Sequence, residues 1–260
     1  MTRMLSHARR LLAALALLFA AGSSGADAPV IAAASDLQFA LEEVAAAFRG
    51  AGGREVKLVF GSSGNFFRQI VQGAPFQMFL SADEQFVLRL AEHGRSEGRG
   101  ELYAAGRIVL FVPRGSPLGR AELAALAPAL EAGTIRRLAI ANPEHAPYGR
   151  AAEQALRSRG LWEKAAPRLV LGENVSQAAQ FAASGSVDAA IFAYSLALSP
   201  RVSEAGSFVL IPAEWHRPLR QRMVLLKGAG ETARAFYRFM QGERSRAILA
   251  RYGFTLPAGL

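Results

Sequence analysis

The chain has 260 residues, a formal net charge of +9 and no cysteine. Without cysteine it forms no disulfide, holds no metal through thiolates and carries no lipid on an N-terminal cysteine. Its cations are scattered. The densest clusters are Arg136 with Arg137, and Arg217 with Arg220 and Arg222, and neither is interleaved with aromatic residues as in proteins that bind single-stranded nucleic acid.

The N-terminus has the three parts of a secretory signal peptide. Residues 1–10 carry three arginines and no acid, residues 11–21 are an unbroken apolar run, and small residues follow. The run is too short to span a bilayer, which takes about 20 apolar residues. We expect cleavage after Ala26, which removes residues 1–26, lowers the formal charge to +6 and leaves a soluble, exported chain.

The next 65 residues alternate short apolar runs with amphipathic segments. Residues 30–34 are a short apolar run and a predicted buried strand, and residues 56–60 and 78–80 are the next predicted strands. Residues 37–48, 66–71 and 84–92 repeat apolar residues at helical spacing. Strands that alternate with helices predict a parallel sheet covered on both faces.

A second series of the same kind begins at residue 107. It predicts strands at 107–113, 138–141, 169–171, 189–193, 208–211 and 223–226, and helices at 123–130, 149–158, 175–184, 232–240 and 244–251. We therefore expect an α/β protein of two lobes, each a mostly parallel sheet flanked by helices, joined by crossing strands around a cleft. Residues 29–107 plus 226–260 are assigned to lobe 1, and 108–225 to lobe 2.

Four turns between a strand and a helix share small or capping residues. They are residues 34–38, 61–65, 142–149 and 172–176. Ser35 and Gln38 match the spacing of a capping box. The glycines of Gly61-Ser62-Ser63-Gly64 allow a close backbone approach that a plain helix cap does not need. Helix N-termini present free N–H groups and partial positive charge, so four such turns facing one cleft predict an anion site built from neutral donors.

The patterns of catalytic sites are absent from the sequence. The second turn lacks the G-x-S-x-G of a nucleophile elbow, because Asn65 stands in place of the last glycine. No two histidines have metal-ligand spacing, and no phosphate-binding or dinucleotide-binding loop occurs. His145, in the third turn, is expected on the loop surface. We therefore predict that the protein is not an enzyme and has neither a cofactor nor a nucleic-acid partner. An alternative interpretation, the ligand-sensing domain of a transcription regulator, would require a DNA-binding segment, and this chain has an export signal in its place.

At these turns the sequence resembles a known family. AASDLQFALEEVAAAF, FGSSGNFFRQIVQGAPFQMFLSAD, IANPEHAPYGRAAEQAL and GENVSQAAQFAASGSVDAAIFAYS are similar to segments of the periplasmic molybdate-binding proteins of ABC transporters. The resemblance covers nearly all of the chain after residue 26. It implies a type II periplasmic binding protein with two lobes and a hinge.

The resemblance also implies which residues hold the oxyanion. Ser35 and Ser63 match the serines that donate hydroxyl hydrogen bonds, and Tyr148 and Val175 match residues that donate backbone N–H groups. Asp36 lies beside them, and we expect its backbone N–H to face the ligand. Some relatives add a tyrosine from a fifth turn, but Ala193 occupies that position here and Tyr194 follows it.

The implied protein is a periplasmic monomer that captures molybdate, and tungstate with it, and delivers it to an ABC permease in the inner membrane. Sulfate and phosphate stay open as alternative ligands. Sulfate and molybdate are fully deprotonated and need only donors, whereas phosphate carries a proton at neutral pH and benefits from an acceptor such as the Asp36 carboxylate. The choice of molybdate rests on the resemblance alone.

Overall fold

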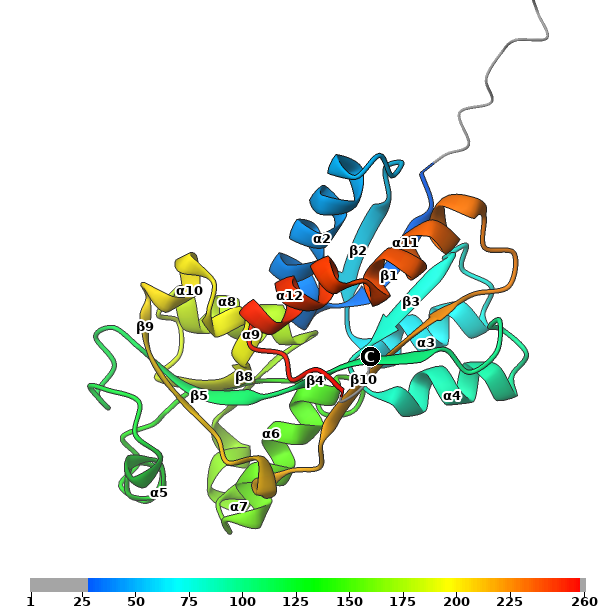
Figure 1. Ribbon diagram of the computed structural model, residues 1–260. Coiled ribbons are helices and arrows are strands. Elements are labelled where there is room, and N and C mark those ends of the chain that lie inside the picture. Colours follow the sequence, from blue (N-terminus) through cyan, green and yellow to red (C-terminus); the bar gives the residue numbers. More distant parts are fainter. Residues whose placement is uncertain (1–27, 258–260) are drawn as a thin grey trace, which may run out of the picture.

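A computed structural model describes residues 28–257 and shows two lobes, each built on one β-sheet (Figure 1). The expected signal peptide, residues 1–26, lies outside the described residues. Within residues 28–257, no helix has the length and apolar character needed to cross a membrane.

Lobe 1 is built on a five-stranded sheet with the order β2-β1-β3-β10-β4. β1, β2 and β3 are parallel, and β10 runs antiparallel to both of its neighbours, β3 and β4. The elements of this lobe are β1 (Val30–Ala34), α2 (Gln38–Gly50), β2 (Lys57–Gly61), α3 (Ser63–Val71), β3 (Met78–Ser81), α4 (Glu84–Glu92), β4 (Glu101–Gly106), β10 (Leu219–Leu225), α11 (Glu231–Gln241) and α12 (Glu243–Arg251).

Lobe 2 repeats this arrangement with the order β7-β6-β8-β5-β9, and here β5 is the strand that runs antiparallel to both neighbours. Its elements are β5 (Ile108–Pro113), α5 (Leu123–Glu131), β6 (Leu138–Ala141), α6 (Pro147–Ser158), α7 (Trp162–Ala165), β7 (Leu169–Gly172), α8 (Val175–Ala183), β8 (Ala189–Ala193), α9 (Tyr194–Ala197), α10 (Pro200–Ser203) and β9 (Gly206–Leu210). The two-lobed, mostly parallel α/β fold expected from the sequence is confirmed.

Strands β1, β3, β5, β6 and β8 are buried on both faces, as the sequence pattern predicts, whereas the edge strands β2, β7 and β9 are partly exposed. In β1, Ile31 and Ala33 pack into one apolar cluster with α2, α11 and α12, whereas Ala32 packs on the other face with α3 and α4. β3 divides in the same way, because Phe79 faces opposite to its neighbours. Lobe 2 has a cluster of its own around β5, β6 and β8.

Two crossings of the chain join the lobes. β4 ends at Gly106 and β5 begins at Ile108, so one residue separates a strand of each sheet. The return path runs from β9 to β10, and β10 pairs with β3 and β4. The expected division left residues 219–225 in lobe 2, whereas strand pairing puts them in the sheet of lobe 1.

Each lobe contains three parallel βα units, which are β1-α2, β2-α3 and β3-α4 in lobe 1 and β6-α6, β7-α8 and β8-α9 in lobe 2. Strands β1 and β2 end next to one another, because Ala34 pairs with Gly61. In lobe 2, Ala141 at the end of β6 pairs with Gly172 at the end of β7. The four turns singled out in the sequence therefore lie at the carboxyl ends of paired strands, where ligands bind in open α/β sheets.

Candidate anion-binding site

A small cavity lies between the lobes where the four turns meet. All five residues predicted for the site lie in its wall, so the fold brings them together from positions far apart in the sequence. Among the described residues that line it there is no basic side chain. The lining residues are Ala34, Ser35, Asp36, Gly61, Ser62, Ser63, Ala82, Ala146, Pro147, Tyr148 and Val175.

Three helices begin at this cavity. Ser63 is the first residue of α3, Tyr148 the second residue of α6 and Val175 the first residue of α8. Their backbone N–H groups belong to the first turns, where no intrahelical acceptor exists. Each helix adds partial positive charge at the same end. The cavity therefore has the electrostatic character of an anion site although no lysine or arginine lines it.

Ser63 is fully buried, and its hydroxyl oxygen accepts a hydrogen bond from the N–H of Ala82 at 3.0 Å. This contact occupies an acceptor position of the oxygen and leaves the hydroxyl hydrogen free to rotate. Within residues 28–257 no acceptor is found for that hydrogen. Ser63 is thus held in place as a donor toward the cavity.

Ser35 lies in a short 3₁₀ helix, Ser35–Leu37, that follows β1. The capping box expected from Ser35 and Gln38 is wrong, since neither that helix nor α2 has a side-chain cap. Instead, the Ser35 hydroxyl reaches lobe 2. It donates to Asn174 Oδ1 at 3.2 Å and accepts from the N–H of Ser176 at 3.3 Å, while the Ser176 hydroxyl donates to the Ser35 carbonyl at 2.8 Å.

Asp36 is buried, and its carboxylate takes part in a network of hydrogen bonds. Asp36 Oδ2 accepts from the Tyr148 hydroxyl at 2.9 Å and from Gln221 Nε2 at 2.6 Å. Gln221 Oε1 in turn accepts from the Tyr103 hydroxyl at 2.6 Å. The Ser195 hydroxyl donates to the Asp36 carbonyl at 2.8 Å. Both Tyr148 and Ser195 belong to lobe 2, so the network joins the lobes beside the cavity.

Burial raises the pKa of the Asp36 carboxyl to about 6, against the opposing effect of its hydrogen bonds from Gln221 and Tyr148. The N–H groups of Asp36 and Leu37 also favour the ionised form, although Asp36 Oδ1 has no hydrogen-bond partner of acceptable geometry among the described residues. Burial, followed by the charge of Asp36, raises the pKa of Tyr148 and of Tyr103 well above the usual value. Both hydroxyls therefore stay protonated and act as donors.

His145 is buried, so its expected place on the loop surface is wrong. Its Nδ1 lies 2.9 Å from the Ser62 hydroxyl oxygen, and its carbonyl accepts from the N–H of Gly64 at 2.9 Å. Its Nε2 lies 3.6 Å from a carboxylate oxygen of Glu173. The turn at residues 142–149, which belongs to lobe 2, therefore packs directly on the Gly-Ser-Ser-Gly turn of lobe 1. The two lobes are thus in contact beside the cavity.

Gln221 and Tyr103 did not figure among the predicted site residues. The strand LRQRMVL alternates buried and more exposed residues, and this alternation places Gln221 on the same face as Leu219 and Met223. A glutamine at a buried strand position needs hydrogen-bond partners, and that signal would have singled it out. Tyr194 does not line the cavity; its ring packs on Phe208 instead.

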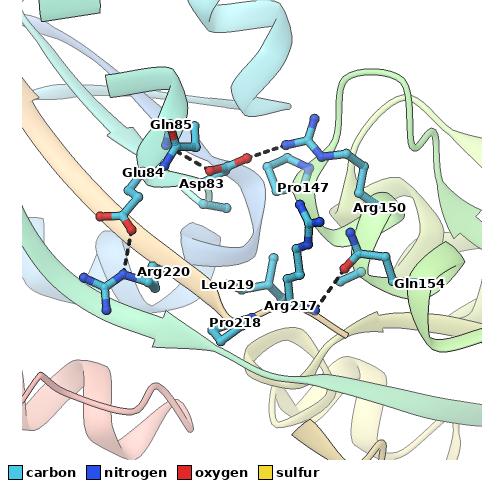
Figure 2. Close-up of a pocket in the computed structure, with 12 residues that line it drawn as sticks. Asp83, Glu84, Gln85, Pro147, Arg150, Gln154, Arg217, Pro218, Leu219 and Arg220 are labelled. Carbon is cyan, nitrogen blue, oxygen red and sulfur yellow. Dashed lines mark hydrogen bonds and ion pairs between the residues drawn. The ribbon is translucent and has the colours of Figure 1, made fainter. Parts of the chain in front are cut away.

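A larger pocket of about 360 Å³ lies beside the small cavity but contains none of the five predicted residues (Figure 2). Its wall carries charges of both signs. Arg150 of lobe 2 contacts Asp83 of lobe 1 at 2.6 Å, and the N–H of Arg217 donates to Gln154 Oε1 at 3.0 Å. The Arg150–Asp83 pair is partly exposed, and pairs of this kind contribute about 1 kcal/mol or less.

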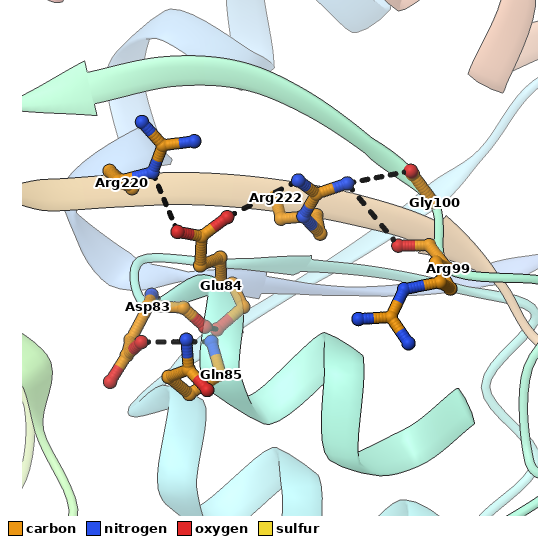
Figure 3. A network of polar contacts seen from close by, with 8 residues as sticks. Asp83, Glu84, Gln85, Arg99, Gly100, Arg220 and Arg222 are labelled. Atoms are coloured by element: carbon orange, nitrogen blue, oxygen red, sulfur yellow. Dashed lines mark hydrogen bonds and ion pairs between the residues drawn. The ribbon is translucent and has the colours of Figure 1, made fainter. Parts of the chain in front are cut away.

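One wall of this pocket is connected to β10 by ion pairs. Glu84, in the first turn of α4, contacts Arg220 at 2.6 Å and Arg222 at 3.2 Å (Figure 3). Arg222 also donates to the carbonyl of Gly100 at 2.8 Å. These contacts fix α4 to the strand that returns from lobe 2. The charges of the pocket are therefore mostly engaged with one another, whereas the small cavity presents free donors.

The described residues contain no group of three or more His, Cys, Asp or Glu side chains that could hold a metal ion. The chemistry that the small cavity offers is reversible capture of an anion by neutral donors.

The sequence and the fold are similar to those of known binding proteins. The family model described as bacterial extracellular solute-binding protein matches residues 29–255. The molybdate-binding protein ModA of Rhodobacter capsulatus is 35% identical, over 93% of this chain and 94% of its own. ModA of Azotobacter vinelandii is 32% identical, over 95% and 97% respectively.

Among solved structures, the periplasmic molybdate-binding protein of Azotobacter vinelandii superposes with a TM-score of 0.79 at 32% identity. The match covers 88% of this chain and 99% of that protein. Both the sequence match and the fold extend over both lobes. The chain therefore belongs to the bacterial extracellular solute-binding proteins and is a binding protein, not an enzyme.

Proposed function

We propose that this protein captures molybdate, and tungstate with it, in the small cavity between the lobes. The observation that carries the proposal is the cavity itself, in which three helix N-termini and the Ser63 hydroxyl converge with no basic side chain. Neutral donors suit a fully deprotonated tetrahedral anion. The molybdate-binding relatives support molybdate as that anion. Tungstate has the same charge and shape, so the same donors serve it.

The ligand is tested by thermal-shift and calorimetric titration with molybdate, tungstate, sulfate and phosphate. We expect molybdate and tungstate to raise the melting temperature most, because a ligand that binds only the folded state stabilises it by mass action; at a hundred times Kd the gain is about 2.7 kcal/mol. Sulfate and phosphate should need far higher concentrations for the same shift. A preference for phosphate would contradict the proposal and assign the Asp36 carboxylate the role of an acceptor.

We further propose that the protein acts as a monomer outside the cytoplasmic membrane and hands its anion to an ABC permease. The basic and apolar segments at residues 1–21 support export, and the solute-binding family supports the role in transport. Cell fractionation should recover a shortened chain in the periplasm. The variant Leu15→Arg, which puts a charge into the apolar run, should leave the full-length chain in the cytoplasm. Wild-type precursor held in the inner membrane would refute the localisation.

A further inference from the structure

Asp36 is the one acidic residue among the described residues that line the anion cavity. Its side chain is buried, so water does not screen its charge. An ionised carboxylate in that position repels a dianion, and burial in a region of low dielectric strengthens the repulsion. The remaining donors of the cavity favour an anion. The site therefore contains a group whose charged form opposes the ligand.

The hydrogen bonds of the Asp36 carboxyl distinguish its two oxygens. Because Gln221 Oε1 accepts from the Tyr103 hydroxyl, the Gln221 amide is oriented with Nε2 toward Asp36. Gln221 Nε2 and the Tyr148 hydroxyl both donate to Oδ2, at 2.6 and 2.9 Å. Oδ1 has no partner within residues 28–257 although it is buried. If the carboxyl carries a proton, that proton belongs on Oδ1, since Oδ2 already accepts two hydrogen bonds.

We propose that the Asp36 carboxyl binds the anion in its protonated form, with Oδ1–H as a hydrogen-bond donor, so that capture of the anion takes up a proton. This inference rests on the proposed function, because it concerns the same cavity and the same class of ligand. It assigns Asp36 a side-chain contact, whereas the sequence led us to expect a contact through its backbone N–H alone. It also explains how an acidic residue is tolerated in the wall of a dianion site.

The surroundings of the carboxyl shift its titration toward neutral pH, so protonating it when the anion binds costs less free energy than it would in water. Burial raises its pKa to about 6, and a dianion in the cavity raises it further as a like charge. The titratable groups that face it are Tyr148 from α6 and Tyr103 from β4, both of which stay neutral. Gln221 from β10 and Ser195 from α9 are uncharged. No lysine, arginine or histidine contributes to the shift.

The direction of the pH effect follows from these facts. Below about pH 6 the free protein already carries the proton, and the anion meets a donor. As the pH rises through the pKa of the free protein, binding must also draw a proton from solution. Affinity then falls by up to about tenfold for each pH unit, until the pH reaches the pKa of the bound state.

The test is calorimetric titration of the mature protein with molybdate between about pH 6 and pH 8.5, in two buffers that differ in ionisation enthalpy. For the wild type we expect affinity to fall as the pH rises and the two buffers to report proton uptake approaching one per anion. In Asp36→Asn the amide Nδ2 supplies a permanent donor where Oδ1–H stood. That variant should show no proton uptake from this site, a flat pH profile and tighter binding than the wild type at pH 8.5.

Two further variants, Ser63→Ala and Tyr148→Phe, distinguish the loss of a donor that does not titrate from a change in the pKa of Asp36. Ser63→Ala should bind more weakly at every pH and keep the wild-type slope, because it removes a donor that does not titrate. Tyr148→Phe removes a hydrogen bond that lowers the pKa of Asp36, so the decline in affinity should begin at a higher pH than in the wild type. A pH profile that is unchanged in Tyr148→Phe would count against the network.

The proposal is overturned if wild-type affinity for molybdate is independent of pH, or if Asp36→Asn retains the wild-type slope. It is also overturned if Asp36→Asn abolishes binding and the wild type prefers phosphate, which would show an ionised carboxylate that accepts a proton from the ligand. A parallel titration with sulfate distinguishes failure of the proposed ligand from failure of the proposed role of Asp36. Sulfate binding with the expected slope but no molybdate binding refutes the proposed ligand and supports the role of Asp36.

Discussion

Replacing Ser63 with alanine is expected to weaken molybdate binding by about tenfold to a hundredfold. A hydrogen bond to a charged group contributes about 1.5–3 kcal/mol, and each 1.4 kcal/mol is a factor of ten in Kd. Ser63 is fully buried at the start of α3 and has a hydroxyl hydrogen with no acceptor among the described residues. Calorimetric titration with molybdate at fixed pH measures the loss.

The control must separate lost binding from lost stability, because Ser63→Ala also deprives the Ala82 N–H of its acceptor. Ser199→Ala is a matched comparison. Ser199 is equally buried and gives up one hydrogen bond, to the Leu196 carbonyl at 2.8 Å, but it does not line the cavity. Both variants should melt somewhat below the wild type, and Ser63→Ala alone should lose affinity. Wild-type affinity in Ser63→Ala would remove this serine from the site.

The fold was predictable because its signals are local and repeated. Short apolar runs such as Val30–Ala34 alternate with segments of helical period, and the runs within the sheets, as in β1, β3, β5, β6 and β8, are buried on both faces. The strand Glu101–Gly106 escaped prediction because it begins with a charged residue, ends in glycine and continues almost directly into the next strand. Its place is fixed by pairing with β10, which is distant in sequence.

The position of the site was predictable for a similar reason, since turns after parallel strands gather at one edge of each sheet. The hydrogen bonds inside the site were not. Ser35 and Gln38 have the spacing of a capping box, yet the Ser35 hydroxyl bonds to Asn174 and Ser176 of the other lobe. A partner more than a hundred residues away leaves no mark on local spacing.

The network around Asp36 shows the same limit. Its members come from a 3₁₀ turn, two crossing strands and α6, and no local pattern links those segments. The burial of His145 could not be predicted from the sequence either. A histidine in a polar turn is usually exposed, and His145 is buried because its turn packs against the Gly-Ser-Ser-Gly turn of the other lobe.

The same contact makes Gly64 the position where the smallest change should have a large effect. Gly64 is the second residue of α3, and its N–H donates to the His145 carbonyl at 2.9 Å. A Cβ atom on Gly64 would lie 2.6 Å from that carbonyl oxygen and 3.0 Å from the His145 Cα. Both atoms are backbone, so they cannot move aside as the end of a flexible side chain would.

We therefore expect Gly64→Ala to hinder closure of the lobes and to weaken molybdate binding by about fivefold to a hundredfold or more. Overpacking of this kind costs about 1–3 kcal/mol, and here the cost applies only when the lobes touch. The separated lobes should be unharmed, because alanine in a helix is more favourable than glycine by about 1 kcal/mol. The melting temperature without ligand should accordingly stay near that of the wild type while affinity falls.

Gly50→Ala provides the matched control, since Gly50 also belongs to a helix and a Cβ atom there would meet nothing within 4 Å. It should bind molybdate as the wild type does. Small-angle scattering with and without molybdate adds a direct measure of closure, and Gly64→Ala should compact less than the wild type when the anion is added. If Gly64→Ala instead binds and compacts like the wild type, the approach of His145 to the Gly-Ser-Ser-Gly turn plays no part in enclosing the anion.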